Sequence, residues 1–208
     1  MKKLIAMTLV LTLALSLLAA CGGSDKPVLK VSISPDFAPM EFVDPTKTGQ
    51  DQFVGFDVSL AKYLASEMDM ALEIVPMSFD ACQSAVSTGQ VDMAISGFSW
   101  MPDRAEKYNL SDTYHAGDNQ SRQVLLTTVE NKDLYAAAES LSGLKIGAQT
   151  ASLQEWLVKE QIPDSTIISF TDIPTGITSF IFIKRLFSSS SLSAIRVCHL
   201  QREISQRA

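Results

Sequence analysis

An alternation of strand-like and helix-like segments limits the fold of this chain more than any other feature. Three short apolar or alternating runs suit strands, and two stretches with apolar residues at helical spacing separate them. A β-α-β-α-β order predicts a parallel sheet with right-handed crossovers. The expected strands lie at residues 28–34, 72–75 and 91–95, and the expected helices begin at Asp57 and span residues 79–87.

The same alternation returns further along the chain. After a polar turn near Gly117, we expect strands at residues 123–127, 145–148 and 166–170, with a helix at residues 153–161 between the last two. The chain is therefore predicted to be an α/β protein with a second, smaller lobe. Ligand sites favour the space between two such lobes.

The segment from Val91 to Arg104 carries the most functional information. Its apolar strand runs into the polar loop Ser96-Gly-Phe-Ser-Trp-Met, and Pro102 suits the first turn of a short helix. Ligands of open α/β sheets bind beyond the carboxyl ends of the strands. Serine hydroxyls, a glycine that permits close approach and the planar guanidinium of Arg104 are suited to a carboxylate. On local pattern alone, a solvated surface loop is the alternative.

Four motifs occur together and in a fixed order. They are Phe37-Ala-Pro-Met-Glu-Phe, Val54-Gly-Phe-Asp-Val-Ser-Leu-Ala-Lys-Tyr-Leu, Ser96-Gly-Phe-Ser-Trp-Met-Pro-Asp-Arg and Gly143-Leu-Lys-Ile-Gly-Ala-Gln-Thr-Ala-Ser-Leu-Gln-Glu. Over residues 28–176, the chain resembles the family 3 extracellular solute-binding proteins, the amino-acid receptors of bacterial ABC importers. The resemblance implies a two-lobed periplasmic-binding-protein type II fold, a free amino acid as ligand, and ABC permease membrane subunits as partners.

A free amino acid presents a carboxylate and an ammonium on one carbon. Arg104 is the expected carboxylate clamp, with Ser99 on a second carboxylate oxygen and the Gly97 carbonyl on the ammonium. Thr150 and Ser152 precede a helix whose backbone N–H groups point at an anion. The ligand-binding residues that we expect are Phe37, Gly97, Phe98, Ser99, Arg104, Thr150 and Ser152, with Phe37 and Phe98 as aromatic walls.

Several neighbouring residues remain open to two interpretations. Trp100 is either a cleft wall or a packing residue, because tryptophan is common at both kinds of site. Asp36 and Glu41 either reach the ligand amine or are solvated acids. Ala151 stands where the family often has glycine, which puts in doubt a close approach of the second-lobe backbone to the ligand.

The N-terminus has the pattern of a secretory signal. Lys2 and Lys3 precede an uncharged apolar stretch at residues 4–18, which is too short for a stable membrane span. Leu18-Ala-Ala-Cys resembles a bacterial lipoprotein signal. We therefore expect a signal at residues 1–20, a lipidated Cys21, a flexible tether at residues 21–27 and an extracytoplasmic protein anchored to the membrane. Plain secretion with an incidental cysteine is the alternative.

Charge and composition narrow the classes of partner. The formal net charge is −6, and loss of Lys2 and Lys3 with the signal makes it more negative, so no footprint for nucleic acid is present. Only Cys82 and Cys198 remain to pair, and neither the cysteines nor His115 and His199 have the spacing of a metal site or a catalytic triad. No metal, cofactor or catalytic residue is expected, and we expect a monomer.

The character of the chain changes after Gly176. Residues 178–208 hold five basic residues against the single acid Glu203, and no helix or strand period persists across them. In the family, a helix, a strand with a ligand-binding aspartate and a return to lobe one would follow. We expect lobe one at residues 28–116, an incomplete lobe two at 117–177 and an aberrant basic tail at 178–208, produced by truncation or a change of reading frame. A divergent, structured C-terminus is the alternative.

Three functions follow from this sequence. The leading one is a lipid-anchored, extracytoplasmic substrate-binding component of an amino-acid ABC importer. The second is a truncated remnant that no longer binds. The third is a dehydratase-like enzyme on the same fold, for which only Asp36 and Glu41 offer a cleft acid or base.

Overall fold

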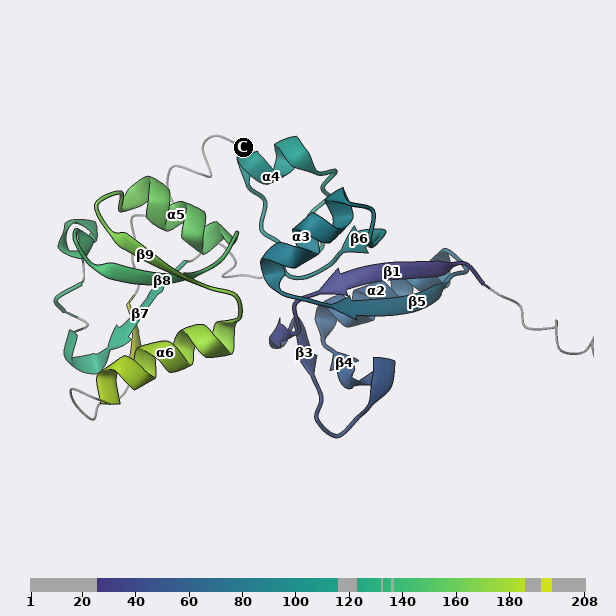
Figure 1. The fold of residues 1–208 in the computed structure, drawn as a ribbon, viewed down its shortest axis with the longest axis horizontal. Coiled ribbons are helices and arrows are strands. Elements are labelled where there is room, and N and C mark those ends of the chain that lie inside the picture. Colours follow the sequence, from purple (N-terminus) through teal and green to yellow (C-terminus); the bar gives the residue numbers. More distant parts are fainter. Residues whose placement is uncertain (1–25, 116–122, 132, 136, 186–191, 196–208) are drawn as a thin grey trace, which may run out of the picture.

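Two parallel sheets organise the molecule, one in each of two α/β bodies that lie side by side (Figure 1). The computed structural model describes residues 26–115, 123–131, 133–135, 137–185 and 192–195. The body that holds residues 28–107 is called the first lobe below, and the body that holds residues 125–185 is called the second lobe. The expected signal, Cys21, the boundary between residues 116 and 117, and most of the tail lie outside the described residues.

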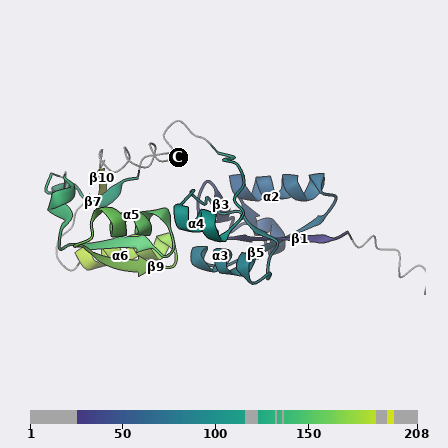
Figure 2. The same ribbon diagram turned by 90° about the horizontal axis from the view of Figure 1, so that it is seen from above.

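In the first lobe, β1 is the central strand between β5 and β6, and both pairings are parallel. The helices α2 and α3 lie on opposite faces of this sheet (Figure 2). Leu29, Val31 and Ile33 of β1 are buried, and with residues of α2 and β5 they form the larger hydrophobic core. The elements are β1 (Val28–Ile33), α2 (Phe56–Glu67), β5 (Ala71–Pro76), α3 (Phe79–Ser87), β6 (Met93–Ala94) and α4 (Pro102–Lys107).

A small antiparallel sheet extends the first lobe beyond the end of β1. Its strands are β2 (Asp36–Phe37), β3 (Glu41–Val43) and β4 (Phe53–Val54), with the 3-10 helix η1 (Gly49–Gln52) between the last two. The sequence analysis did not predict these strands, because a period of two residues cannot be recognised in segments this short. This sheet places Phe37 and Glu41 beside the loop that follows β6.

In the second lobe, the parallel pair of β8 and β9 lies between α5 and α6 (Figure 1). Its core is smaller and contains Leu141, Ile146, Val158 and Ile162. The strand β7 pairs with β10 in antiparallel fashion. The elements are β7 (Leu125–Thr128), η2 (Val129–Asn131), η3 (Ala138–Leu141), β8 (Lys145–Gln149), α5 (Leu153–Gln161), β9 (Thr166–Phe170), α6 (Ile173–Arg185) and β10 (Leu192–Ile195).

Most predicted elements are confirmed to within two residues, but the third strand is shorter than expected. Only Met93 and Ala94 pair with β1, although Val91 and Ile95 are buried as predicted. The residues on either side still contact β1 through their backbone, because the N–H groups of Asp92 and Ile95 donate to the carbonyls of Lys30 and Ser32 at 3.0 Å and 3.1 Å.

The sequence analysis found no helix or strand period that persists across residues 178–208. In the structure, α6 continues into this range as far as Arg185, and residues 192–195 form β10. A start signal for α6 is present in the sequence: Asp172 accepts a hydrogen bond from the Thr175 N–H at 2.8 Å, and Pro174 stands in the first turn. None of the helices in the described ranges is both long enough and apolar enough to cross a membrane.

Candidate functional site

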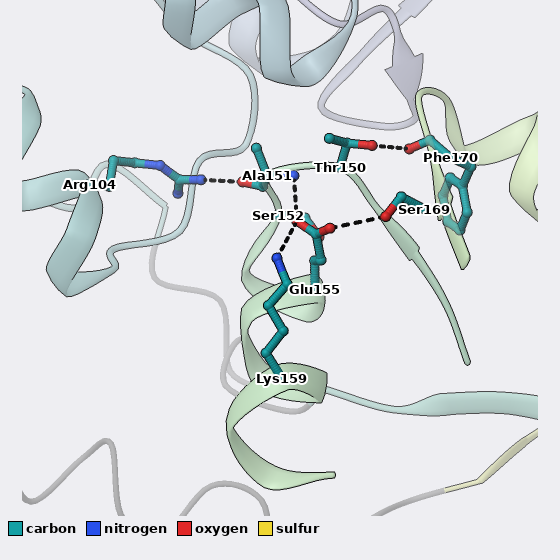
Figure 3. A network of polar contacts seen from close by, with 8 residues as sticks. All are labelled: Arg104, Thr150, Ala151, Ser152, Glu155, Lys159, Ser169 and Phe170. Atoms are coloured by element: carbon teal, nitrogen blue, oxygen red, sulfur yellow. Dashed lines mark hydrogen bonds and ion pairs between the residues drawn. The ribbon is translucent and has the colours of Figure 1, made fainter. Parts of the chain in front are cut away.

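Arg104 lies at the centre of the loop that the sequence analysis singled out. Pro102 begins α4, as predicted, and this helix places Arg104 with 5% of its surface exposed. Three acceptors surround the guanidinium. Nε donates to Gln83 Oε1 at 3.1 Å, one terminal nitrogen donates to the Ser99 carbonyl, and the other donates to the Ala151 carbonyl of the second lobe at 3.0 Å. Arg104 therefore links the two lobes (Figure 3).

Among the residues that the structure describes, the charge of Arg104 has no ionic partner. Within the described ranges, no carboxylate lies at ion-pair distance from its guanidinium. The rings of Phe79 and Phe98 flank it, with centroids 5.9 Å and 5.1 Å away. Burial lowers the pKa of the guanidinium, and Tyr108 opposes that shift. Of the five N–H groups of an arginine, three have the acceptors named above, so two terminal N–H groups remain for an anion.

The Ser96–Gly97 turn leads from β6 to Arg104 and is held by buried acids. Gly97 has a φ of +55°, and its N–H donates to Asp57 Oδ2 at 2.6 Å. A Cβ at this position would lie 3.1 Å from two ring carbons of Phe37. Phe37 is thus the group that lies closest to Gly97 in this structure, and close approach of a ligand to Gly97 stays a prediction. The Ser96 hydroxyl donates to Glu41 Oε1 at 2.5 Å.

The corner from Thr150 to Glu155 faces Arg104 from the second lobe (Figure 3). Ser152 is buried and caps α5, because its hydroxyl accepts from the Glu155 N–H at 3.1 Å. The Glu155 carboxylate in turn accepts from the Ala151 N–H at 2.9 Å. Thr150 donates its hydroxyl to the Phe170 carbonyl at 3.2 Å. Ala151 has a φ of +60°, which explains physically why glycine suits this position.

The expected site residues fall into two groups. Phe98, Ser99 and Arg104 from the first lobe lie together against the Thr150–Ser152 corner, joined through the Ala151 carbonyl. Phe37 contacts Gly97 and is 43% exposed, and its role as a cleft wall stays a prediction. Trp100 is 54% exposed, so it is not a core packing residue.

The two acids left open by the sequence have different environments. Asp36 Oδ2 accepts from the Ile173 N–H of α6 at 2.7 Å and forms a second link between the lobes. Glu41 is fully buried beneath the Ser96 hydroxyl, so the interpretation of Glu41 as a solvated acid is wrong. Its burial follows from its place on β3, which packs against the loop.

Several residues at this site were missed by the sequence analysis. Phe79 and Gln83 contact Arg104 from α3, and their spacing of four residues on one helix face was a usable signal. Glu155 was also missed, although it has the spacing of a capping box with the expected site residue Ser152, a pattern that sequence alone can show. Asp57 and Tyr114, which meet at Asp57 Oδ2, had no local signal because they lie far apart in the chain.

The described part of the chain offers little evidence for a metal site or for a reactive cysteine. Its histidine, cysteine and acidic residues form no group of three or more that could hold a metal ion. Cys82 is a small buried residue of α3, as predicted, and burial raises the pKa of its thiol to about 12.

Comparison with known proteins gives consistent matches. Residues 29–161 match the family model of bacterial extracellular solute-binding proteins, family 3. The arginine-binding extracellular protein ArtP of Bacillus subtilis is 33% identical over 154 residues, which are 71% of this chain and 56% of ArtP. The histidine-binding periplasmic protein of Escherichia coli is 28% identical over 155 residues, covering 74% of this chain and 56% of that protein. The chain thus spans little more than half the length of these relatives.

Solved structures agree with the sequence matches. The amino acid ABC transporter substrate-binding protein AbpA from Streptococcus pneumoniae, bound to L-arginine, has a TM-score of 0.66 at 31% identity, covering 80% of this chain and 67% of AbpA. The ancestral amino acid-binding protein AncCDT-1, a precursor of cyclohexadienyl dehydratase, has a TM-score of 0.65 at 28% identity over 80% of this chain and 70% of that one. The expected α/β fold of the periplasmic-binding-protein type is confirmed. The chain belongs to the bacterial extracellular solute-binding proteins of family 3.

Proposed function

We propose that the chain binds a free amino acid between its two lobes, with Arg104 as the clamp for the carboxylate. The observation that carries this proposal is a buried cation without a carboxylate partner in the described ranges. Burying a charge is unfavourable unless a partner compensates for it. A ligand carboxylate on the two remaining terminal N–H groups would supply that partner in a bidentate arrangement.

The neighbouring groups suit the rest of an amino acid. Ser99 stands beside Arg104 and offers a hydroxyl to the second carboxylate oxygen, and the Gly97 carbonyl offers an acceptor to the ammonium. Thr150 and Ser152 line the opposite corner of the second lobe. The Ser152 hydroxyl accepts from the Glu155 N–H, and its own hydrogen would be the group that it offers to a ligand carboxylate. Phe37 and Phe98 supply the apolar walls.

A titration of the chain with amino acids tests this proposal directly. The relatives named above are an arginine-binding and a histidine-binding protein, so L-arginine and L-histidine are the first probes, followed by the other common amino acids. Agmatine, which is arginine without its carboxylate, is the matched control ligand. We expect calorimetric binding of at least one L-amino acid and none of agmatine. A folded chain that binds no amino acid contradicts the proposal and favours the non-binding remnant.

We further propose that the protein works outside the cytoplasm, anchored by a lipidated Cys21, and passes its ligand to an ABC permease. The apolar stretch before Cys21 and the polar tether after it support this placement. Two or more acyl chains would anchor the protein stably, whereas one would bind a membrane only marginally. Mass spectrometry of the mature N-terminus is the test. An unmodified Cys21, or a mature chain that begins elsewhere, contradicts the anchor.

A further inference from the structure

Two carboxyl groups are buried together behind the Ser96–Gly97 turn. Glu41 on β3 is 1% exposed and Asp57 in the first turn of α2 is 0% exposed. The other titratable groups whose charges act on Glu41 or are acted on by it are Asp36 on β2, Cys82 on α3 and Tyr114. None of these is cationic. Two ionised carboxylates in such a place would repel each other without any compensating charge.

The contacts of the two carboxyl groups leave one oxygen over on each. Glu41 Oε1 accepts from the Ser96 hydroxyl at 2.5 Å. Asp57 Oδ2 accepts from the Gly97 N–H at 2.6 Å and from the Tyr114 hydroxyl at 3.1 Å. Glu41 Oε2 and Asp57 Oδ1 are buried, and no donor among the described residues reaches either of them. Ionised carboxylates can only accept, so a proton on one of the pair is what would give these two oxygens a hydrogen bond.

We propose that Glu41 and Asp57 share one proton through Glu41 Oε2 and Asp57 Oδ1, and that this carboxyl pair positions the Ser96–Gly97 turn for ligand binding. One proton completes the whole set of contacts. Glu41 accepts from Ser96 and donates to Asp57, and Asp57 accepts from Glu41, Gly97 and Tyr114. The role in ligand binding rests on the proposed function, whereas the shared proton does not.

The proton belongs mainly to Glu41. Burial raises the pKa of Glu41 to about 9, the Ser96 hydrogen bond opposes that shift, and the charge of Asp57 adds to it. Asp57 Oδ2 accepts hydrogen bonds from the Gly97 N–H and the Tyr114 hydroxyl, so the shared proton is placed on Glu41. Burial and the charge of Asp57 also raise the pKa of Tyr114, so its hydroxyl remains a neutral donor. The pair therefore carries a single negative charge at neutral pH.

The pair touches consecutive residues of the ligand loop. Through Ser96 and Gly97 it attaches the loop to β3 and to α2, only a few residues before Ser99 and Arg104. The Ser96 oxygen also accepts from the Ser34 N–H at 3.0 Å, which adds the end of β1 to the same assembly. Glu41 and Asp57 are thus positioning residues that act through the loop and need not contact the ligand.

A carbon NMR titration of the full chain, labelled at the side-chain carboxyl carbons of glutamate and aspartate, tests the shared proton. We expect one glutamate carbon to have the shift of a neutral acid at pH 7 and to titrate near pH 9. That signal should vanish in Glu41→Gln and persist in the matched control Glu67→Gln, which changes an exposed glutamate at the end of α2. If every glutamate carbon of the wild type is ionised at pH 7, the shared proton is refuted without any variant.

The positioning role is tested by comparing two substitutions of Glu41. Glutamine keeps a donor toward Asp57, so Glu41→Gln should keep the Gly97 amide protected from hydrogen exchange and keep the affinity for L-arginine within about threefold. Glu41→Ala removes the donor, so exchange should accelerate and affinity fall about tenfold or more. Equal damage by both substitutions would overturn the positioning role. If the wild type binds no amino acid but shows the neutral glutamate, the proposed function fails and the shared proton stands.

Discussion

The two sides of the proposed cleft hold their polar groups by different means. On the first lobe, residues 96–104 are fixed by side chains that arrive from β3, α2 and α3, many positions away in the sequence. On the second lobe, the corner at residues 150–155 is fixed mainly by its own helix, through Ser152 and Glu155. The first side depends on tertiary packing, and the second depends on local helix capping. Substitutions on the first side should therefore have the larger effects.

The two sides also differ in how deeply their charged groups are buried. The first lobe buries the charge of Arg104 and the acid pair of Glu41 and Asp57. In the second lobe, Glu155 (side chain 12% exposed) forms an ion pair at 3.4 Å with Lys159 (side chain 57% exposed). A buried charge without a counter-ion responds to ligands and to pH more strongly than a charge with a solvent-exposed partner does. Ligand affinity and pH dependence should both originate on the first lobe.

Replacing Arg104 by lysine should have the largest effect. Lysine keeps the charge but loses the planar fork that binds a carboxylate bidentately. Losing such a contact costs about 2–5 kcal/mol, or roughly a 30-fold to several-thousand-fold loss of affinity. Calorimetric titration of Arg104→Lys with the best ligand of the wild type measures this loss, and thermal melts check that the variant folds.

The control for that experiment is Lys107→Ala, which removes an exposed cation from the same helix. It should leave the affinity unchanged, because it lies on the solvent side of α4. If Arg104→Lys binds as tightly as the wild type, the arginine only joins the lobes, and the first side of the cleft has no special role in binding.

The second effect is a dependence of stability on pH. The folded-state pKa of Glu41, about 9, lies above the ordinary value of 4.5 that applies when the chain is unfolded. The folded protein therefore holds a proton that the unfolded chain releases, so its contribution is complete below pH 4.5 and is lost as the pH rises toward 9. One proton gives a slope of about 1.4 kcal/mol per pH unit.

Denaturant unfolding at several pH values measures this slope. Glu41→Gln should remove it, because an amide does not titrate, whereas Glu67→Gln should leave it unchanged. Asp44, whose pKa is lowered mainly by its hydrogen bonds with Thr46, acts in the opposite direction and only at lower pH. If Glu41→Gln keeps the slope of the wild type, the slope does not come from Glu41, and the acid pair does not make the stability of the first lobe depend on pH.

The contrast between the lobes also explains what the sequence could predict. Local patterns determined α3 and α5, whose bounds match the expectation at both ends, and they identified Arg104 at the start of a short helix. The pairing of Glu41 with Asp57 had no local pattern, because β3 is only three residues long and the partners are joined only in the fold. Tertiary contacts of this kind are visible only once the sheets are assembled.

Local chemistry was also overlooked where it was available. The start of α6 is encoded by Asp172, Pro174 and Thr175, whereas the basic residues and serines further along show no helix period. Similarly, Thr150 and Ser152 were expected to lie at an anion site, whereas the Ser152-x-x-Glu155 pattern also encodes the cap of α5. The ligand-binding roles of Phe37, Gly97, Phe98, Ser99, Arg104, Thr150 and Ser152 stay predictions until a titration is made.

Removing the cap of α5 should have a moderate effect. Ser152→Ala deletes the hydroxyl that accepts from the Glu155 N–H, which typically costs about 1 kcal/mol. For a chain of this size, the midpoint of thermal unfolding should fall by roughly 2–4 °C. Calorimetry measures the shift, with Ser66→Ala on the exposed surface of α2 as the control. A loss as large as that caused by Glu41→Ala would contradict the view that the second side relies on local capping.

The smallest expected effect is a gain in stability at Ala151. This residue has a φ of +60°, where a side chain with a Cβ is strained by roughly 1–2 kcal/mol, and glycine avoids that strain at the cost of a more flexible unfolded chain. Ala151→Gly should therefore stabilise the protein by about 0.5 kcal/mol. Ala137→Gly, at an ordinary φ of −121°, is the matched control and should give no gain.

Ala151→Gly also tests whether the second lobe acts on the ligand through its backbone or through a side chain. Arg104 bonds to the carbonyl of Ala151, and glycine retains that carbonyl, so affinity for the best ligand should stay within about threefold. A marked loss of affinity in Ala151→Gly would show that the Ala151 methyl group contacts the ligand. A loss of stability would instead show that the left-handed conformation is not strained at this corner. Melting and titration of one variant thus test whether the second lobe contributes mainly backbone groups, in contrast to the side chains of the first.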